Sequence, residues 1–582
     1  MFNRGKVVKQ AGLFLLLALI VLALGWPLAE ILREAVWKQG HLTGSVIAET
    51  AAAPGLGAVL LNTAIIIAVS STLATVIGGV LAVVATKLKL RWAEAFRAIP
   101  LVPLTIAPLV GAIGWVFLLA PRTGWINIFL RQFTGGDEGP LNIFTLPGVI
   151  FVTTLYIVPY VFATMASALD RINSETFEAF LLNGTGRAGA AFRVVTGVLR
   201  PALLAGFILA TLEAAIQFSI PLILNVHVLT TSIYDYVQHA SPARRDMAAT
   251  LAVLLVLFGS CLTAAEVMIL GRRRSASLGG RGLSQQRWSF GRTMDRALAG
   301  IAVLYLVVSA LLPLLAILLV SVLPYWKPQF SIAEFTVRHY VRVFGSGNFL
   351  DAALNSVKLA AIGVVAVIVI SLLISIVRAR TRSRIGQLLY VVGNLPLGVP
   401  GVVLGLGALI LFTTGPIPLY GTLTGLVLAY VIHHLPMALR NIDPIVHQVG
   451  KELEEAARVT GAGETRVLAD VTIPLVLPGI TAAAAVTMIL MLREFPMSAL
   501  LSTPSTKVLS VYLVNSFENG VFPQVAAMAI GLSLVSMLGV IALQVLRSRV
   551  KFGKKSPDAG QKDLPRAPVL GAVDFGVGQG SA

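Results

Sequence analysis

The sequence predicts an all-α membrane protein that crosses the bilayer about twelve times, as two parallel six-helix repeats. Of its 582 residues, 56% are hydrophobic and only 12% are charged, whereas soluble domains carry about 25% charged residues. Apolar runs of about 20 residues, the length of a membrane-spanning helix, recur along the chain. Sequence landmarks of the first half also return in the second half at nearly constant spacing.

The apolar runs define the expected spans. We expect them at approximately 11–31, 58–86, 98–120, 144–168, 201–225, 247–270, 297–325, 353–377, 387–413, 421–439, 474–502 and 522–546. The first run follows a basic start and lacks a clear small-x-small cleavage site, so we expect a retained span and not a cleaved signal peptide.

The distribution of basic residues predicts the orientation. With the N-terminus in the cytoplasm, 33 of the 45 Lys and Arg residues fall in cytoplasmic segments and 10 fall outside. Cytoplasmic loops of membrane proteins carry such an excess. Both termini are therefore expected in the cytoplasm, and the net charge of +18 is interpreted as a topology signal and not as a nucleic-acid-binding surface.

The same pattern divides the chain. We expect a first six-span half over 1–270, a flexible Arg-, Ser- and Gly-rich cytoplasmic linker over 271–296, a second six-span half over 297–550, and a disordered cytoplasmic tail over 551–582. Six spans per half and an intracellular linker make the halves parallel. Parallel repeats predict a pseudo-twofold axis along the membrane normal, with a pathway between the halves.

Several short motifs support the duplication. They are "LNT" from Leu61 and "LNS" from Leu354, "PLTIAP" from Pro103 and "PLGVP" from Pro396, Pro159 and Pro436, and "SIYDY" and "SVYLV", which would place Tyr234 and Tyr512 in register. The prolines Pro103, Pro108, Pro396 and Pro400 predict kinks or breaks in the third and ninth spans.

The polar stretch "EAARVTGAG" (455–463) stands out in this apolar chain. A similar stretch with several substitutions, "EAFLLNGTG" (178–186), occurs in the first half. The alignment that pairs Glu178 with Glu455 continues without a gap to Pro201 and Pro478. Good helix formers followed by Gly461 predict a short helix with a left-handed C-terminal cap. Each half would thus present a helix–glycine–helix elbow beneath the membrane, although an ordinary interfacial loop is the alternative interpretation.

Glu455, Ala456, Ala457 and Gly461, followed by Val471, Ile473 and Pro474, resemble the signature of inner-membrane permeases of binding-protein-dependent ABC importers. The resemblance implies that Glu455, Ala456, Ala457 and Gly461 contact one ATPase copy, and that Glu178, Ala179 and Gly184 contact the other. The first copy departs from the signature at Phe180 and at Gly197, which stands where the second copy has Pro474. Docking at the first elbow is therefore expected to be weaker or asymmetric.

The resemblance also implies partners and a location. It places the chain in the cytoplasmic (inner) membrane with two ABC ATPase subunits inside and a solute-binding protein outside. No G-x-x-x-x-G-K-[S/T] phosphate loop occurs in the sequence, so ATP and Mg²⁺ are expected on the ATPases, and this chain is expected to bind no cofactor and to catalyse no reaction. "LREFPMSALL" and "FENGVFPQVAAMAIGL" are similar to the iron(III)-type branch. Iron(III) is the first expected solute, with 2-aminoethylphosphonate and thiamine as alternatives.

Polar residues inside the expected spans are candidates for the translocation path. Glu213 lies near mid-bilayer, with Gln217 expected one turn later on the same helix face. At the matching depth of the second half lie Arg493, Glu494 and Ser498. These side chains would line a cavity between the halves or, alternatively, would pair structurally.

Three further features of the sequence bear on metal binding and on the class of transporter. His433 and His434 are adjacent and project about 100° apart on a helix, so we expect packing or hydrogen bonding and no metal site. "HVLTTSIYDYVQH" (227–239) has residue types that could bind iron outside the membrane. A gradient-driven secondary transporter is the rival of another class, but "TKLKLRWAEAFR" lacks the G-x-x-x-D-[R/K]-x-G-[R/K]-[R/K] signature expected between its second and third spans.

Overall fold

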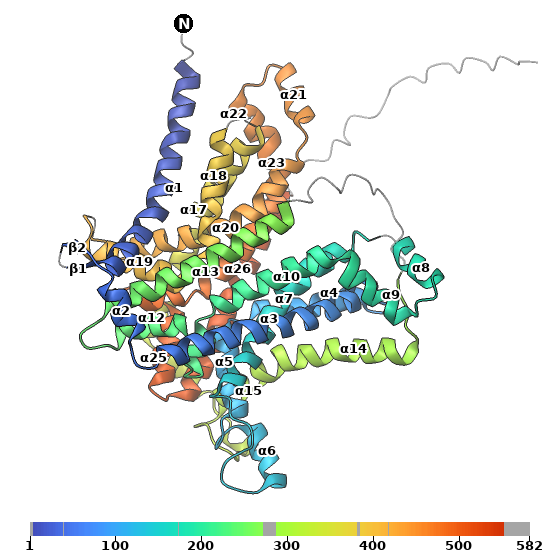
Figure 1. Cartoon of the computed structure of the whole chain (residues 1–582), viewed down its shortest axis with the longest axis vertical. Coiled ribbons are helices and arrows are strands. Elements are labelled where there is room, and N and C mark those ends of the chain that lie inside the picture. Colours follow the sequence, from blue (N-terminus) through green and yellow to red (C-terminus); the bar gives the residue numbers. More distant parts are fainter. Residues whose placement is uncertain are drawn as a thin grey trace, which may run out of the picture.

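The computed structural model describes residues 4–38, 40–172, 174–271, 287–380, 384–416 and 418–551, and these are mostly helical (Figure 1). Within these ranges the strands are limited to a two-residue hairpin, β1 (Trp37–Lys38) and β2 (His41–Leu42), paired antiparallel. The all-α prediction is confirmed. Most of the predicted disordered tail, residues 552–582, lies outside the described residues.

The described elements of the first half follow one another without large gaps. They are α1 (Arg4–Val36), the hairpin, α2 (Ser45–Ala51), α3 (Leu56–Lys87), α4 (Ala93–Ala98), η1 (Ile99–Thr105), α5 (Pro108–Leu119), α6 (Trp125–Thr134), α7 (Leu146–Leu169), α8 (Ser174–Leu182), α9 (Arg187–Arg193), η2 (Val194–Val198), α10 (Arg200–Ala215), α11 (Ser219–Ile223), α12 (Leu229–Gln238) and α13 (Arg245–Gly271).

The second half has a similar series. It consists of α14 (Arg292–Leu306), η3 (Val307–Leu311), α15 (Leu312–Val322), η4 (Ile332–Glu334), α16 (Arg338–Phe344), α17 (Gly347–Arg380), α18 (Arg384–Asn394), η5 (Leu395–Gly398), α19 (Gly401–Thr414), α20 (Leu423–Gln448), α21 (Lys451–Val459), α22 (Glu464–Val467), η6 (Leu468–Thr472), α23 (Ile473–Leu492), α24 (Pro496–Leu501), α25 (Leu509–Glu518) and α26 (Phe522–Lys551).

These elements give a multi-pass membrane protein. In the described part of the chain, 9 helices are long and apolar enough to cross a membrane, and the number reaches 12 when each of 3 bent helix pairs is counted as one span. The upper number equals the predicted count. Much of the apolar surface of these helices, including most of α1, is not buried within the chain, as expected where lipid covers it.

The predicted breaks in the third and ninth spans are confirmed. The η1–α5 pair is bent by 90° and the η5–α19 pair by 104°. Proline disfavours the helical conformation of the residue before it, and Ala107, which precedes Pro108, is accordingly extended with φ −61° and ψ 134°. Each half therefore contains a sharply broken helix at the same place in its order of elements, and the first half has a further bent pair, Arg187–Val198 with Arg200–Ala215, at 70°.

The predicted spans 201–225 and 474–502 are wrong at their ends, because α10 stops at Ala215 and α23 at Leu492. Pro221 and Pro496 cannot continue a helix that reaches them, since proline lacks an N–H and clashes with the carbonyl four residues earlier. The chain instead breaks and restarts as the short helices α11 and α24. The polar residues expected on a helix face therefore lie in or beside these breaks.

The duplication is visible in the order of elements and in matching hydrogen bonds. The series α3, η1–α5, α7, α8–α9, α10, α11, α12 and α13 recurs as α17, η5–α19, α20, α21–α22, α23, α24, α25 and α26. The Asn62 side-chain amide donates to the His227 carbonyl at 3.2 Å, and that of Asn355 donates to the Lys507 carbonyl at 3.1 Å. The "LNT" and "LNS" motifs thus have the same structural role. The exact boundaries of the two halves stay a prediction.

The neighbouring hydroxyl repeats this pattern and corrects one register. Thr63 Oγ1 accepts from the Leu229 N–H at 3.0 Å, and Ser356 Oγ accepts from the Leu509 N–H at 2.9 Å. Leu229 and Leu509 open α12 and α25, so Tyr234 matches Val514 in these helices. The predicted match of Tyr234 with Tyr512 is therefore wrong by two positions, because the chain between α11 and α12 is shorter than that between α24 and α25.

The first helix of each half packs against the other half. Helix α1 packs on α19 and α18 of the second half, and α14–α15 packs on η1 and α5 of the first. Each half therefore covers the broken helix of the other half, which makes the breaks part of the contact between them.

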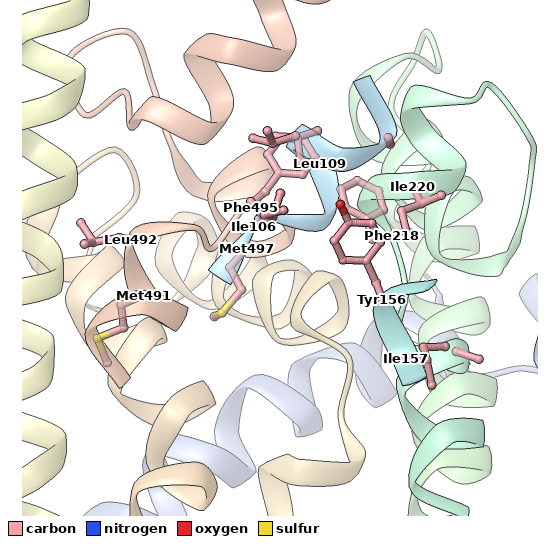
Figure 2. Packing of buried hydrophobic residues seen from close by; sticks show 14 of the residues in the cluster. Ile106, Leu109, Tyr156, Ile157, Phe218, Ile220, Met491, Leu492, Phe495 and Met497 are labelled. Carbon is pink, nitrogen blue, oxygen red and sulfur yellow. The ribbon is translucent and has the colours of Figure 1, made fainter. Parts of the chain in front are cut away.

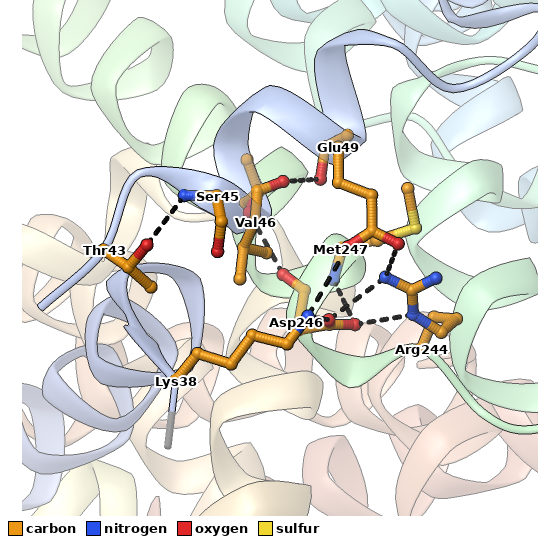
Figure 3. A network of polar contacts seen from close by, with 10 residues as sticks. Lys38, Thr43, Ser45, Val46, Glu49, Arg244, Asp246 and Met247 are labelled. Atoms are coloured by element: carbon orange, nitrogen blue, oxygen red, sulfur yellow. Dashed lines mark hydrogen bonds and ion pairs between the residues drawn. The ribbon is translucent and has the colours of Figure 1, made fainter. Parts of the chain in front are cut away.

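On the side of the molecule away from the elbows, a polar network ties the segment after α1 to the start of α13 (Figure 3). Arg244 Nη2 lies 2.8 Å from Glu49 Oε1, and Arg244 Nε lies 3.0 Å from Asp246 Oδ1, with Lys38 Nζ 3.5 Å from Glu49 Oε2. The hydrogen bond from Arg244 lowers the pKa of the exposed Glu49 carboxyl.

Candidate coupling surface and translocation path

Both polar repeats form the elbows that the sequence predicted. Gly184 and Gly461 follow α8 and α21 with φ of +75° and +88°, a left-handed conformation that glycine adopts without steric cost. The Ala462 N–H donates to the Ala457 carbonyl at 3.1 Å and the Gly461 N–H to the Arg458 carbonyl at 2.9 Å. This pair of bonds is a Schellman cap. The first elbow is capped in the same way, with distances of 3.2 and 3.0 Å.

The predicted coupling residues are at the surface. Those exposed are Glu178, Ala179, Gly184, Glu455, Ala456 and Gly461, and Ala457 is half-buried. The last residues of α8 and α21, Leu182 and Val459, occupy matching positions of the two repeats and are each 89% exposed. Each elbow thus exposes an apolar side chain at the same position of its repeat. In Figure 1 the elbows lie at the right and upper margins.

A buried ion pair anchors the second elbow. The Glu454 carboxylate is buried, and its Oε1 accepts from Arg380 Nε at 2.7 Å and from Thr472 Oγ1 at 2.8 Å. Arg380 Nη2 also donates to the Val449 carbonyl at 3.2 Å. Because Arg380 is the last residue of α17, these bonds fix α21 to the end of a membrane-spanning helix.

An aromatic stack replaces this ion pair in the first elbow. In the register that pairs Glu178 with Glu455, Phe177 occupies the position of Glu454, and it stacks on Trp288 with ring centroids 4.3 Å apart and planes at 12°. Lys87, the last residue of α3, donates from Nζ to the Ile172 carbonyl at 3.2 Å. That bond repeats the one from Arg380 to Val449. The basic residue is thus kept in both halves, and its acidic partner is exchanged for an aromatic pair.

Trp288 belongs to a segment that the sequence assigned to the flexible linker. Residues 272–286 lie outside the described residues, but 287–290 are held against the first half, and α14 already begins at Arg292. The Trp288 N–H donates to the Lys87 carbonyl at 2.6 Å and the Lys89 N–H to the Trp288 carbonyl at 3.3 Å. The prediction that 271–296 is flexible throughout is therefore wrong at its C-terminal end. The aromatic residues of "RWSF" within a polar segment were the available signal.

Two phenylalanines meet between the halves at the helix breaks. Phe218 and Phe495 occupy matching positions of the two repeats, are both buried, and stack with ring centroids 5.4 Å apart and planes at 19°. They lie in the packed core with Ile106 and Tyr156 near them (Figure 2). Sequence analysis missed this pair, although each follows directly on a polar residue that it singled out, Gln217 or Glu494.

The five predicted path residues do not belong to the lining of the outer cavity described below, and their role in transport stays a prediction. Gln217 lies in the break after α10 and not on the same helix face as Glu213, because α10 ends at Ala215. Arg493 reaches from the second half to the first, and its Nη1 donates to the carbonyls of Leu104 and Ile106, the latter at 3.4 Å. Within the described residues, Arg493 thus bonds to backbone carbonyls and forms no ion pair within 4.0 Å.

Glu494 and Ser498 have structural partners. Glu494 Oε1 accepts from the Met497 N–H at 3.2 Å, in the first turn of α24. Ser498 is fully buried, and its Oγ lies 2.6 Å from the Tyr430 hydroxyl. These contacts satisfy polar groups that the interrupted helix would otherwise leave unpaired.

A large solvent-accessible cavity lies elsewhere, at the ends of the helices remote from the elbows. It has a volume of about 1470 Å³ and is lined by the start of α3 and by α12 and α25. Its polar residues include Asn62, His227, Asp235, His239 and Glu518.

Part of the predicted outer His/Tyr/Asp segment thus faces this cavity. His239 Nδ1 lies 3.0 Å from Asp235 Oδ1, and His227 Nε2 lies 3.9 Å from Asp235 Oδ2. Burial, with the charges of Glu518 and Asp235, raises the pKa of the nearby Tyr234 to about 12. Tyr234 is therefore a neutral phenol near neutral pH.

Comparison with known proteins confirms the resemblance drawn from the elbow motif. Residues 367–552 match the family described as "Binding-protein-dependent transport system inner membrane component". The chain is 23% identical over 481 residues to "Ferric transport system permease protein FbpB" of Actinobacillus pleuropneumoniae, covering 81% of this chain and 68% of that protein. It is 26% identical to "Probable ABC transporter permease protein y4fN" of Sinorhizobium fredii, covering 94% and 97%.

Two further similarities cover about one half of the chain. "Putative 2-aminoethylphosphonate transport system permease protein PhnV" of Salmonella typhimurium is 25% identical over 256 residues, which cover 44% of this chain and 96% of that protein. A solved bacterial ABC transporter involved in the import of the acidic polysaccharide alginate aligns with a TM-score of 0.38 at 15% identity, covering 44% of this chain and 97% of the solved chain.

Proposed function

Since residues 367–552 match the binding-protein-dependent transport family, we propose that this multi-pass chain supplies both permease halves of an ABC importer. It would move a small solute inward from an external binding protein, and two separate ATPases would drive the transport. The observation that carries the proposal is the pair of elbows. Each has the same cap, the same exposed apolar tip and a fixed connection to a membrane-spanning helix.

The anchors suggest how an ATPase would act on the spans. Lys87 and Arg380 are the last residues of α3 and α17, and each bonds to a backbone carbonyl just before its elbow. Helix α3 packs on α7 and α10, and α17 packs on α20 and α23. A displacement of either elbow would therefore move a packed group of spans and not only the loop. This chain makes and breaks no covalent bond in the proposal, and ATP and Mg²⁺ would bind to the ATPases alone.

The Phe218–Phe495 stack supports a closed path between the halves. Apolar rings exclude water and ions from a constriction, and the bond from Arg493 to the first half lies close by in sequence. The outer cavity would receive solute from the binding protein, and separation of the two rings would connect it with the cytoplasmic side. In this orientation both termini lie in the cytoplasm and the protein resides in the cytoplasmic membrane.

Iron(III) is the solute that we propose first. The similarity to ferric permeases supports it, as do Asp235 and Glu518 in the outer cavity, since carboxylates favour a cation over an anion. 2-Aminoethylphosphonate remains the alternative supported by the PhnV relatives. Thiamine rests on the branch resemblance alone.

Co-purification of the ATPases tests the elbows. Leu182→Asp and Val459→Asp place a charge on each exposed apolar tip, where no buried packing is lost, and should together release the ATPases from the purified complex. Ile332→Asp is the matched control, because Ile332 is 79% exposed in η4, outside the elbows. Retention of both ATPases by the double variant would contradict the proposal.

A further inference from the structure

Three metal-binding side chains meet beside the break of the second half. His433 and His434 lie in α20, and Glu494 lies between α23 and α24. One donor atom from each lies within 4.8 Å of the others, and His433 Nε2 is 4.0 Å from Glu494 Oε2. Adjacent histidines were expected only to pack or form hydrogen bonds. Glu494, from a distant segment of the chain, lies close enough to both histidines to form a three-residue group with them. The spacing of residues in the sequence could not predict this contact.

Hydrogen bonds orient two of the three donors. His434 is buried, and its Nδ1 lies 3.0 Å from the Tyr430 carbonyl. A carbonyl can only accept, so the neutral ring donates from Nδ1 and keeps a lone pair on Nε2, as metal-bound histidines commonly do. Glu494 Oε1 accepts from the Met497 N–H, which leaves Oε2 directed towards His433. The donors are thus partly preorganised without a metal.

Space in front of the donors is kept open by a glycine. A Cβ atom at Gly401, the first residue of α19, would lie 3.3 Å from Glu494 Oε1 and 3.5 Å from His433 Nε2. The His433 side chain is 21% exposed and that of Glu494 is 9% exposed, so the group is reachable from one side. Arg493, the neighbouring cation, is directed to the carbonyls of the first half.

The first half shows that the fold does not need these residues. In the register that pairs Phe218 with Phe495, it has Tyr156, Ile157 and Gln217 in place of His433, His434 and Glu494. The same helices, α7 and α10, pack there without a histidine or a carboxylate at these places. The packing of these helices therefore does not by itself require the three donors of the second half.

We propose that His433, His434 and Glu494 bind a divalent first-row transition-metal ion at the helix break, next to the Phe218–Phe495 stack. Two imidazoles and one carboxylate suit such ions and leave coordination positions open. One negative and two neutral ligands partly compensate the ion's charge in a low-dielectric site. The site is proposed for a divalent ion and not for the proposed solute, iron(III), so it does not rest on the proposed function.

Metal titration of the full chain in lipid nanodiscs, without ATPases, tests the site. Co²⁺ should bind at one equivalent with a visible ligand-field absorption. His433→Tyr and Glu494→Gln, which install the residues of the first half, should weaken binding by more than about 100-fold. His447→Gln is the control, because His447 lies on the same helix, bonded to the Asp443 carbonyl at 2.8 Å.

Two results would overturn the site. One is the absence of saturable Co²⁺ binding by the unaltered chain, and the other is equal binding by the two variants and the unaltered chain. Both variants should elute as monodisperse protein, so a loss of binding reports on the ligands. Neither result depends on ATP hydrolysis, so failure of this site and failure of the importer proposal are distinguishable.

Discussion

Replacement of Trp288 by alanine should detach the first elbow and leave the second elbow in place. Trp288 is 3% exposed and stacks on Phe177 at 4.3 Å. The stack alone contributes about 0.5–1.5 kcal/mol, and truncation of a buried tryptophan typically costs about 3–5 kcal/mol. Because no acid stands at position 177 to bind Lys87 instead, we expect a loss of about 3 kcal/mol in local stability, or roughly a hundred-fold in the opening equilibrium.

Hydrogen exchange measures this opening directly. Amides of α8 and α9 should exchange roughly a hundred-fold faster in Trp288→Ala when exchange follows the opening equilibrium. Peptides that cover α21 and α22 should be unchanged. The matched variant Glu454→Gln should speed exchange in α21 and α22 and leave α8 and α9 unchanged. It leaves Arg380 without its buried counter-ion, and breaking a buried ion pair in this way costs about 3–5 kcal/mol of stability. Unchanged exchange at the first elbow in Trp288→Ala would refute the anchoring argument.

Transplanting the ion pair provides a rescue. Lys87→Arg, Phe177→Glu and Val195→Thr reproduce, at the matching positions of the first half, the residues Arg380, Glu454 and Thr472 of the second elbow. Added to Trp288→Ala, these changes should restore slow exchange in α8. Failure of the rescue together with slow exchange in the second elbow would show that the two anchors are not equivalent.

Three further predictions concern the breaks and the outer surface. Phe495→Ala should open a leak for small ions across proteoliposomes while the unaltered chain stays tight; equal leak rates would contradict a closing role for the ring stack. Ser356→Ala leaves the buried Leu509 N–H without its acceptor and should destabilise the chain by about 1–3 kcal/mol, visible as a lower thermal midpoint in detergent, whereas an unchanged midpoint would mean another acceptor replaces the hydroxyl. Arg244 lowers the pKa of Glu49 in the folded state. Their contact should therefore stabilise the fold above the unfolded-state pKa of Glu49, and this stabilisation should be lost as the pH falls through the lowered pKa. Glu49→Gln should make the thermal midpoint less dependent on pH in the acid range.

Local chemistry explains what the sequence could predict. Apolar length sets the spans, and proline fixes the breaks after Ala107 and Val399. The cap at Gly461 follows from its freedom at positive φ. Each of these features depends on a few neighbouring residues, so one sequence is sufficient to predict it.

Contacts between distant residues explain what it could not. The predicted ends of α10 and α23 lie too far along the chain. The sequence stays hydrophobic past Ala215 and Leu492, whereas the helices end at these residues. The stacking of Phe218 on Phe495, the meeting of Glu494 with the two histidines, and the docking of Trp288 on Phe177 all join segments far apart in the chain. The constant register between the repeats was the one sequence signal that pointed to the first of these.

ATP hydrolysis in nanodiscs that contain this chain and its co-purified ATPases tests the importer proposal and the role of the elbows together. The rate would be measured with and without binding protein loaded with iron(III) or 2-aminoethylphosphonate. We expect that one loaded binding protein raises the rate and that Gly461→Asp abolishes the rise. Gly520→Asp is the control, because Gly520 also has positive φ, at +73°, and open space where a Cβ atom would lie, but it follows α25 near the outer cavity. Uptake driven by a proton or sodium gradient without any ATPase would contradict the importer proposal.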